Sequence, residues 1–335
     1  MAFGPSKRLK WRSTIILGSY PNQNGPTNFA EEPNIQCYDS LKVKSVLNEI
    51  NGLTHNGKSA APTPTILGMN FQAVSVGEKL IEKSLSLTGG YLDSIGTPSP
   101  SLMGEIEFVD ASIGEMVAAL RNNGISGSTL IVITAKHGQS PIDSARYLGI
   151  ANSTGDPITT SPATILDGAG CLPLSESPSN PTGIGPTEDD VSMIWLNNTC
   201  TTASAVSLLR STSPANNNVA GIGEIFSGPI LTTYFNAPGL PPSGDPRTPD
   251  ILVTPDIGVT YSGSGKKLAE HGGFSRDDTN VIMLLSNPSF KAKTVTSFVE
   301  TAQVAPTILK ALGLDPNQLQ GVQMEHTQVL PAVTF

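Results

Sequence analysis

The sequence predicts an α/β protein, and three observations favour that fold class. Short apolar runs of strand length alternate with amphipathic segments of helical period. One such helical segment stands between two apolar runs, as in a strand–helix–strand unit. Only 14% of the 335 residues are charged, and Ser, Thr, Gly, Pro and Asn take their place, which favours long ordered loops over a helical bundle. We therefore expect one α/β domain with a loop-rich insertion.

The chain is expected to begin with an irregular segment. Residues 1–36 show neither helical nor strand periodicity. Asp39 and Ser40 then cap a short amphipathic helix, and Gly52 follows it as a stop signal. The apolar face of this helix consists of Val43, Val46, Leu47 and Ile50. The domain proper is predicted to span residues 37–335.

The clearest helix of the chain covers residues 101–122, and Gly124 ends it. Its apolar stripe consists of Leu102, Ile106, Val109, Ile113, Met116, Val117 and Leu120. Residues 65–69 form an apolar run before this helix, and residues 130–133 form another after it, so both are expected to be buried strands. Because parallel neighbours need a crossover connection, this order predicts a parallel unit.

The second half of the chain starts with a long stretch that has no period. Residues 148–190 are rich in Ser, Thr, Pro and Gly, which predicts the loop-rich insertion. Regular patterns return after it. Further strands are expected at residues 191–196, 250–254 and 281–285, and further helices at residues 202–209 and 306–312.

Charge and hydropathy narrow the classes of partner. The net charge of -8 argues against a nucleic-acid polymer, because phosphate binding needs a basic face. No apolar run approaches the roughly 18 residues of a membrane span, so none is expected. The basic N-terminus carries an apolar stretch too short for a signal peptide. No oligomeric state is predicted.

The cysteines and two sequence patterns bear on the compartment. Cys37, Cys171 and Cys200 make no metal motif, which leaves either one disulfide with a free thiol or three unpaired thiols. N-glycosylation patterns begin at Asn152 and Asn197. These patterns favour a secreted or extracytoplasmic location for the full-length parent protein, although we recognise no targeting signal in this sequence.

Two of the four histidines stand in glycine-flanked positions that fit a functional site. His137 follows the strand at residues 130–133 directly, and His271 precedes two glycines. Ligands of open α/β sheets bind beyond the carboxyl ends of strands. Asp93, in a glycine-rich turn before the long helix, adds a carboxylate. Histidine nitrogens and carboxylate oxygens are zinc ligands, so these three residues are candidates for a metal site.

Residues 134–141, Thr-Ala-Lys-His-Gly-Gln-Ser-Pro, and residues 269–274, Ala-Glu-His-Gly-Gly-Phe, resemble the alkaline phosphatase superfamily. More narrowly, they resemble its type I phosphodiesterase/nucleotide pyrophosphatase group, as do residues 109–114 and 301–314. The resemblance implies an alkaline-phosphatase-like, mostly parallel sheet flanked by helices. It also implies two metal ions, usually zinc, at the strand ends, and a small-molecule phosphate ester as substrate. For this chain we expect zinc or another divalent metal, as one ion or two.

Carried over by position, the resemblance makes Asp93 and His271 ligands of one metal and His137 a ligand of the other. Lys136 stands where the family has an aspartate ligand, and Thr97 stands where it tends to have a histidine. Lys136 is therefore either a catalytic residue that stands in for the charge of the second metal and holds a substrate phosphate, or a solvated lysine at the end of a strand. Glu270, beside His271, stays open between ligand and bystander.

The first strand of the family, with its metal-binding Asp and its Ser or Thr nucleophile, has no counterpart in residues 1–36. The chain is expected to be a family member shortened at its N-terminus. The favoured function is metal-dependent hydrolysis of phosphate mono- or diesters, impaired by this loss. The alternatives are a catalytically inactive fragment or pseudoenzyme that keeps the fold, and a purely structural or binding protein.

Overall fold

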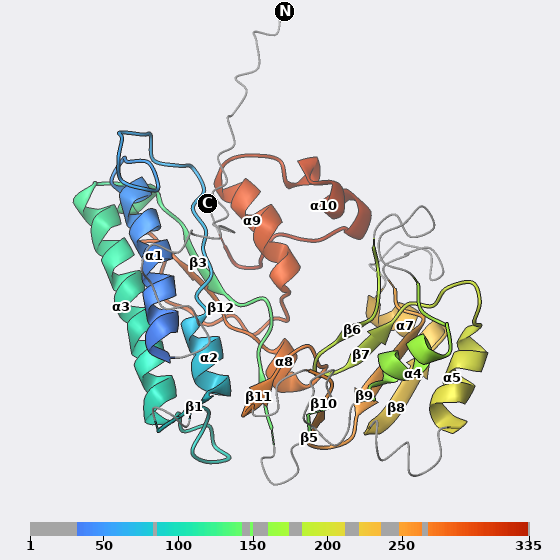
Figure 1. Ribbon diagram of the computed structural model, residues 1–335. Coiled ribbons are helices and arrows are strands. Elements are labelled where there is room, and N and C mark those ends of the chain that lie inside the picture. Colours follow the sequence, from blue (N-terminus) through green and yellow to red (C-terminus); the bar gives the residue numbers. More distant parts are fainter. Residues whose placement is uncertain are drawn as a thin grey trace, which may run out of the picture. The chain divides into compact units, whose positions relative to one another are not determined.

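The computed structural model describes residues 32–82, 86–142, 148–149, 160–173, 183–211, 221–235, 248–262 and 267–333 (Figure 1). The chain divides into two compact units. Unit 1 comprises Met1–Ile131 with Ser286–Phe290, and unit 2 comprises Val132–Leu285 with Lys291–Phe335. Each is described by itself. No helix in the described ranges has both the length and the apolar character to cross a membrane.

Unit 1 is built on helices that bury a small apolar core. They are α1 (Glu32–Ile50), α2 (Ala73–Lys79) and α3 (Pro100–Asn122). The α1 and α3 helices run side by side (Figure 1) and bury Val46, Ile50 and Leu120 between them. Local sequence sets the start of α3, since the Ser99 side chain accepts the N–H of Leu102 and Pro100 occupies the first turn. The helix predicted at residues 101–122 is thus confirmed.

The prediction that Asp39 caps its own helix is wrong. The α1 helix already begins at Glu32, so residues 32–36 are helical rather than irregular, while residues 1–31 lie outside the described ranges. The carboxylate of Asp39 instead accepts the N–H groups of Gln72 and Ala73, at the start of α2. Asp39 is a cap, but for a helix that lies more than thirty residues further along the chain.

The strand predicted at residues 65–69 does not form, and this stretch is irregular. Its apolar side chains Leu67 and Met69 pack on the α1–α3 core instead of pairing with a neighbouring strand. The predicted parallel crossover therefore lacks its first strand. The described strands of unit 1 nearby are a short antiparallel pair, β1 (Ile81–Glu82) and β2 (Leu87–Thr88).

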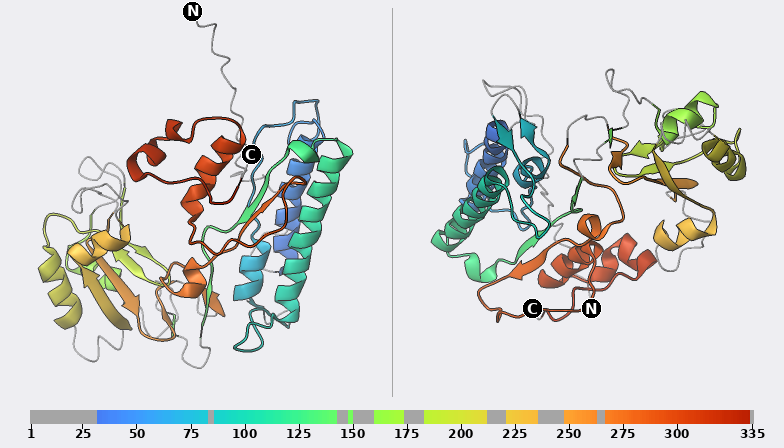
Figure 2. Two further views of the ribbon diagram at one scale, coloured as in Figure 1. Left: turned by 180° about the vertical axis from the view of Figure 1, so that it is seen from behind. Right: turned by 90° about the horizontal axis from the view of Figure 1, so that it is seen from below.

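Unit 2 contains a four-stranded antiparallel sheet with the order β6-β7-β9-β8. Its strands are β6 (Thr187–Glu188), β7 (Ser192–Ile194), β8 (Ile222–Ser227) and β9 (Ile251–Pro255). Ile194, Ile251 and Val253 are fully buried in the core of this unit. Helices α4 (Pro162–Gly168) and α5 (Thr202–Ser211) add Leu166 and Leu209 to that core (Figures 1 and 2).

The stretch predicted as an insertion without regular structure contains α4. Ser161 accepts the N–H of Thr164, Pro162 opens the helix, and Leu166 is buried completely. A cap and one buried leucine are enough for a helix of seven residues once a sheet covers it. The sequence argument missed it because its period is too short to detect among small polar residues.

Of the two cysteine alternatives, the structure contains the disulfide. Cys171 and Cys200 are bonded, and Cys37 is an exposed free thiol. The side-chain amide of Asn197 donates to the carbonyls of Gly170 and Leu172, on either side of the first cysteine. Asn197 therefore holds the disulfide loop, a role that occupies the nitrogen a glycan would need. The other pattern, at Asn152, lies outside the described residues.

Three smaller sheets complete the described strands of unit 2. They are β3 (Ile131–Thr134) with β12 (Met283–Ser286), β4 (Ser140–Pro141) with β11 (Ala269–Glu270), and β5 (Leu148–Gly149) with β10 (Val259–Thr260). The remaining helices in the described part of unit 2 are α7 (Pro229–Phe235), α8 (Arg276–Thr279), α9 (Val304–Ala311) and α10 (Gln320–Glu325), with 3-10 turns at Thr301–Gln303 and Pro316–Gln318. A further 3-10 turn, at Ser126–Ser128, belongs to unit 1.

The α/β class and the later elements agree with the predictions. Strands lie at or within two residues of those expected at residues 130–133, 191–196, 250–254 and 281–285, as do the helices expected at residues 202–209 and 306–312. The strand directions differ from the expectation of a mostly parallel sheet. Of the pairs with a described register, β5–β10 is parallel and the others are antiparallel. The strands of the four-stranded sheet pair antiparallel, although α5 lies between β7 and β8 in the chain and α7 lies between β8 and β9.

Candidate metal and phosphoester site

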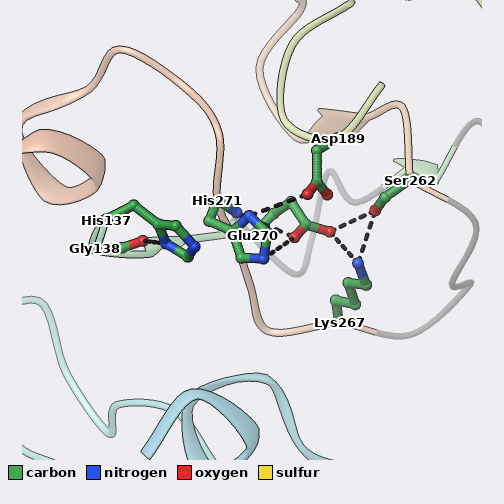
Figure 3. Close-up of polar contacts among 7 residues, drawn as sticks. All are labelled: His137, Gly138, Asp189, Ser262, Lys267, Glu270 and His271. Atoms are coloured by element: carbon green, nitrogen blue, oxygen red, sulfur yellow. Dashed lines mark hydrogen bonds and ion pairs between the residues drawn. The ribbon is translucent and has the colours of Figure 1, made fainter. Parts of the chain in front are cut away.

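Two short strands bring the predicted histidines together in unit 2. In the β4–β11 pair, Ser140 lies opposite Glu270. His137 comes three residues before Ser140, and His271 directly follows Glu270. The two imidazole rings consequently lie 4.2 Å apart between centroids, at 35° to one another (Figure 3). The structure thus places both glycine-flanked histidines in one site.

His137 is held so that one ring nitrogen is open. Its Nδ1 lies 2.8 Å from the carbonyl oxygen of Gly138, and since a carbonyl only accepts, Nδ1 is the donor. In the neutral ring, Nε2 then carries the lone pair that can bind a metal or accept a proton. Gly138 itself donates its N–H to the carbonyl of Asp278. A Cβ at position 138 would lie 1.9 Å from the carbonyl oxygen of Asp277, so only glycine fits.

His271 lies between His137 on one side and two carboxylates on the other (Figure 3). Its Nδ1 is 3.0 Å from Oδ2 of Asp189, and its Nε2 is 4.0 Å from Oε1 of Glu270. The backbone fixes the same arrangement, because the carbonyl of His271 accepts the N–H of Asp190. Asp189 follows β6 directly, so the edge of the four-stranded sheet supplies one carboxylate and β11 the other.

Asp189, Glu270 and His271 have the spacing of metal ligands. Each offers one ligand atom, and these atoms lie within 4.8 Å of one another. Zinc binds such atoms at about 2.0–2.2 Å, so two ligands of one ion are separated by at most about 4.4 Å. A small side-chain shift brings all three to that distance. The donor set of one imidazole and two carboxylates suits zinc and other divalent ions of similar preference.

The electrostatics of the site favour a cation. Burial, followed by the negative charges of Asp278, Glu270 and Asp189, raises the pKa of Asp190 to about 7. Burial is the largest single effect on Asp189 and acts to raise its pKa, but the hydrogen bonds with His271 and Glu270 and the charges of His271 and Lys267 together outweigh it, so the pKa is lowered. Several carboxylates therefore share a partly dehydrated space, where a positive charge is stabilised.

A cluster of Asp278, Ser140 and Ser275 lies next to the site and is held together by hydrogen bonds. Asp278 is 2% exposed, and its Oδ2 accepts the hydroxyls of Ser140 and Ser275 at 2.6 and 2.9 Å. The N–H of Asp278 donates back to Ser275, which caps α8. Because Gly273 lies against the carboxylates of Asp190 and Asp278, a Cβ there would be 2.3 Å from the former and 2.8 Å from the latter. A side chain at position 273 would therefore displace these two carboxylates.

The other predicted residues lie in different surroundings. Lys136 is exposed, beside His137 in the chain. Asp93 belongs to unit 1, in an exposed turn where its Oδ1 accepts the N–H groups of Ile95 and Thr97. The Thr97 side chain, more than any other group, lowers the pKa of Asp93. The roles of Lys136 as a catalytic residue and of Asp93 as a ligand stay predictions.

Sequence reasoning missed Asp189, and it left Glu270 undecided. Glu270 had one usable signal, its position directly before a glycine-flanked histidine. Asp189 had none, because it belongs to the stretch predicted as a loop-rich insertion and joins the site only through the fold.

Comparison with known proteins identifies a family and a number of similar solved structures. The type I phosphodiesterase / nucleotide pyrophosphatase family matches residues 88–275. This range includes the candidate site residues Asp93, Lys136, His137, Asp189, Glu270 and His271. A solved structure of human ectonucleotide pyrophosphatase / phosphodiesterase 5 is similar, with 15% sequence identity and a TM-score of 0.48. The alignment covers 80% of this chain and 58% of that one, so the chain spans little more than half of its length. No curated protein matches.

Proposed function

Because the chain belongs to the type I phosphodiesterase / nucleotide pyrophosphatase family, we propose that it is a metal-dependent hydrolase of small phosphate mono- or diesters. The observation that carries this proposal is the convergence of Asp189, Glu270 and His271 at metal-ligand spacing, with His137 stacked beside them. All four residues fall within the part of the chain that the family matches.

The residues of the site have different roles in this proposal. Asp189, Glu270 and His271 would hold a divalent ion, zinc in the first place, which supplies Lewis acidity to a phosphoryl oxygen. His137, whose Nδ1 donates to Gly138, presents Nε2 as a further ligand or as a proton acceptor. Lys136 is exposed next to it and serves as a phosphate anchor. The Ser or Thr nucleophile of the family would precede residue 37, and residues 1–31 lie outside the described ranges.

The proposal is tested by hydrolysis of bis-p-nitrophenyl phosphate and p-nitrophenyl phosphate with added zinc. We expect turnover that a chelator abolishes and zinc restores. His271→Ala should lower turnover by at least about a hundredfold, since it removes a metal ligand. The matched control is His55→Ala, which changes an exposed histidine of unit 1. Equal turnover of the two variants would contradict the assigned site.

A second candidate is a pseudoenzyme that binds metal or phosphate without hydrolysis. Two departures favour it, namely Lys136 in place of the family's aspartate ligand and Thr97 in place of its histidine. The two candidates differ in one measurable respect. Zinc binding by the native chain, combined with no turnover of either ester, would select the pseudoenzyme.

A further inference from the structure

Glu270 is a buried carboxylate whose two oxygens face different partners. Its side chain is 1% exposed. Oε1 accepts the N–H of His271 at 3.1 Å and lies on the side of the candidate metal site. Oε2 accepts from the ammonium of Lys267 and the hydroxyl of Ser262 (Figure 3). One carboxylate thus connects the metal site with a lysine.

The environment of Lys267 fixes its ammonium at Oε2. The side chain is 18% exposed, and Nζ also donates to Oγ of Ser262 at 2.9 Å. A bend at Leu268 separates Lys267 from β11, and the carbonyl of Leu268 accepts the N–H of Ile142. Loss of the ammonium would remove a positive charge in direct contact with the buried Glu270 carboxylate, which is strongly unfavourable.

Glu270 has the geometry of a bridging carboxylate. In centres with two metal ions, paired cations lie about 3.5–4 Å apart. Here one oxygen of Glu270 faces the ligand atoms of Asp189 and His271, and the other forms an ion pair with the ammonium of Lys267. The ammonium is a compact point charge that makes contacts much as an ion does.

We propose that the ammonium of Lys267 takes the place of a second cation at Glu270, so that the site of Asp189, Glu270 and His271 binds a single divalent ion. This inference rests on the metal site of the proposed function. Lys267 is a positioning residue, because it holds Glu270 and balances its charge without contacting the ion. It fills the electrostatic role that the sequence argument offered to Lys136.

The test is the number and affinity of bound zinc ions, measured by isothermal titration calorimetry and by metal analysis of the dialysed protein. The native chain should bind one ion. Lys267→Gln keeps a hydrogen-bond donor but removes the charge, and it should bind a second ion or bind the first at least about tenfold more tightly. Lys267→Arg keeps the charge and should restore the native stoichiometry and an affinity within about threefold. The matched control is Lys310→Gln, at an exposed lysine of α9, which should bind as the native chain does.

Two results would overturn the inference while the metal site survives, namely two ions in the native chain, or unchanged stoichiometry and affinity in Lys267→Gln. No zinc binding by the native chain would instead remove the metal site itself, and the inference with it. Circular dichroism checks that each variant folds. If Lys267→Gln does not fold, the stoichiometry of the native chain and of Lys267→Arg decides, since both must bind one ion.

Discussion

Asp39→Ala should be among the most destabilising single substitutions in unit 1. Asp39 is completely buried, and its Oδ2 accepts the N–H groups of Gln72 and Ala73 at 2.8 and 2.9 Å. Its Oδ1 lies 2.6 Å from Nζ of Lys42, which is also buried. The substitution therefore removes the cap of α2 and leaves an ammonium in the interior with one carbonyl partner, that of Asn70.

The size of the effect follows from these contacts. Loss of a capping side chain costs about 1 kcal/mol, and breaking a buried ion pair from one side costs about 3–5 kcal/mol. The two losses share the same carboxylate and do not add fully, so we expect a decrease of about 4 kcal/mol in the free energy of unfolding. Much of the stability of an ordinary domain, about 5–15 kcal/mol, would be lost.

Urea unfolding followed by far-ultraviolet circular dichroism measures this change, because α1, α2 and α3 dominate the helical signal of unit 1. Ser40→Ala is the matched control. The Ser40 hydroxyl is exposed and donates to the carbonyl of Gln36 one turn earlier, so its loss should change the free energy by no more than about 0.5 kcal/mol. A loss below about 1 kcal/mol in Asp39→Ala, or an equal loss in both variants, would refute the capping argument.

Three more substitutions test the site and the core. Gly138→Ala should weaken zinc binding by about tenfold or more in calorimetry, because the added Cβ would lie 1.9 Å from the Asp277 carbonyl oxygen and must displace the segment that carries His137. The raised pKa of Asp190, about 7 against about 3.9 in the unfolded chain, means that the folded state binds this proton more tightly. The stability of the metal-free protein should therefore fall as pH rises from about 4 to about 7, and Asp190→Asn should remove about 1–2 kcal/mol of that fall in urea titrations. Leu166→Ala should lower the free energy of unfolding by about 2–5 kcal/mol in thermal or urea unfolding, because it empties a fully buried position.

Each of these predictions has a control or a contrary outcome. Gly114→Ala serves beside Gly138→Ala, because a Cβ at position 114 meets no atom within 4 Å in helix α3, so zinc binding should be unchanged. Native and Asp190→Asn proteins with the same pH profile would show that the carboxyl is not held protonated. Ile257→Ala, at a side chain that is 72% exposed, should cost less than about 0.5 kcal/mol, and an equal loss in Leu166→Ala would place that leucine outside the core.

The parts of the fold that the sequence predicts are those that depend on local signals. The α3 helix has a serine cap, a proline in its first turn and an apolar stripe, all within its own residues. The β9 strand is short, apolar and buried at Ile251, Leu252 and Val253, so its composition alone identifies it. Such elements need no knowledge of their neighbours.

The failures have a common physical cause, since each depends on a partner that is distant in the sequence. Asp39 has the right chemistry for a cap, but the N–H groups that it accepts belong to Gln72 and Ala73. The apolar run at residues 65–69 has the composition of a strand, yet Leu67 and Met69 pack on the apolar core of α1 and α3 and the run does not form a strand. The composition of a segment shows that it can be buried. Only the fold determines which surface covers it.

The site shows the same division between local signals and contacts made only by the fold. His137 and His271 carry local signals, and the β4–β11 register then makes them neighbours. Lys136 precedes His137 in the chain, at a bend that follows β3, and its side chain is exposed. Lys267 is three residues from Glu270, and the bend between them returns its side chain to the buried carboxylate. The course of the backbone therefore decides which lysine contacts the buried carboxylate of Glu270, and adjacency to a site residue in the sequence does not.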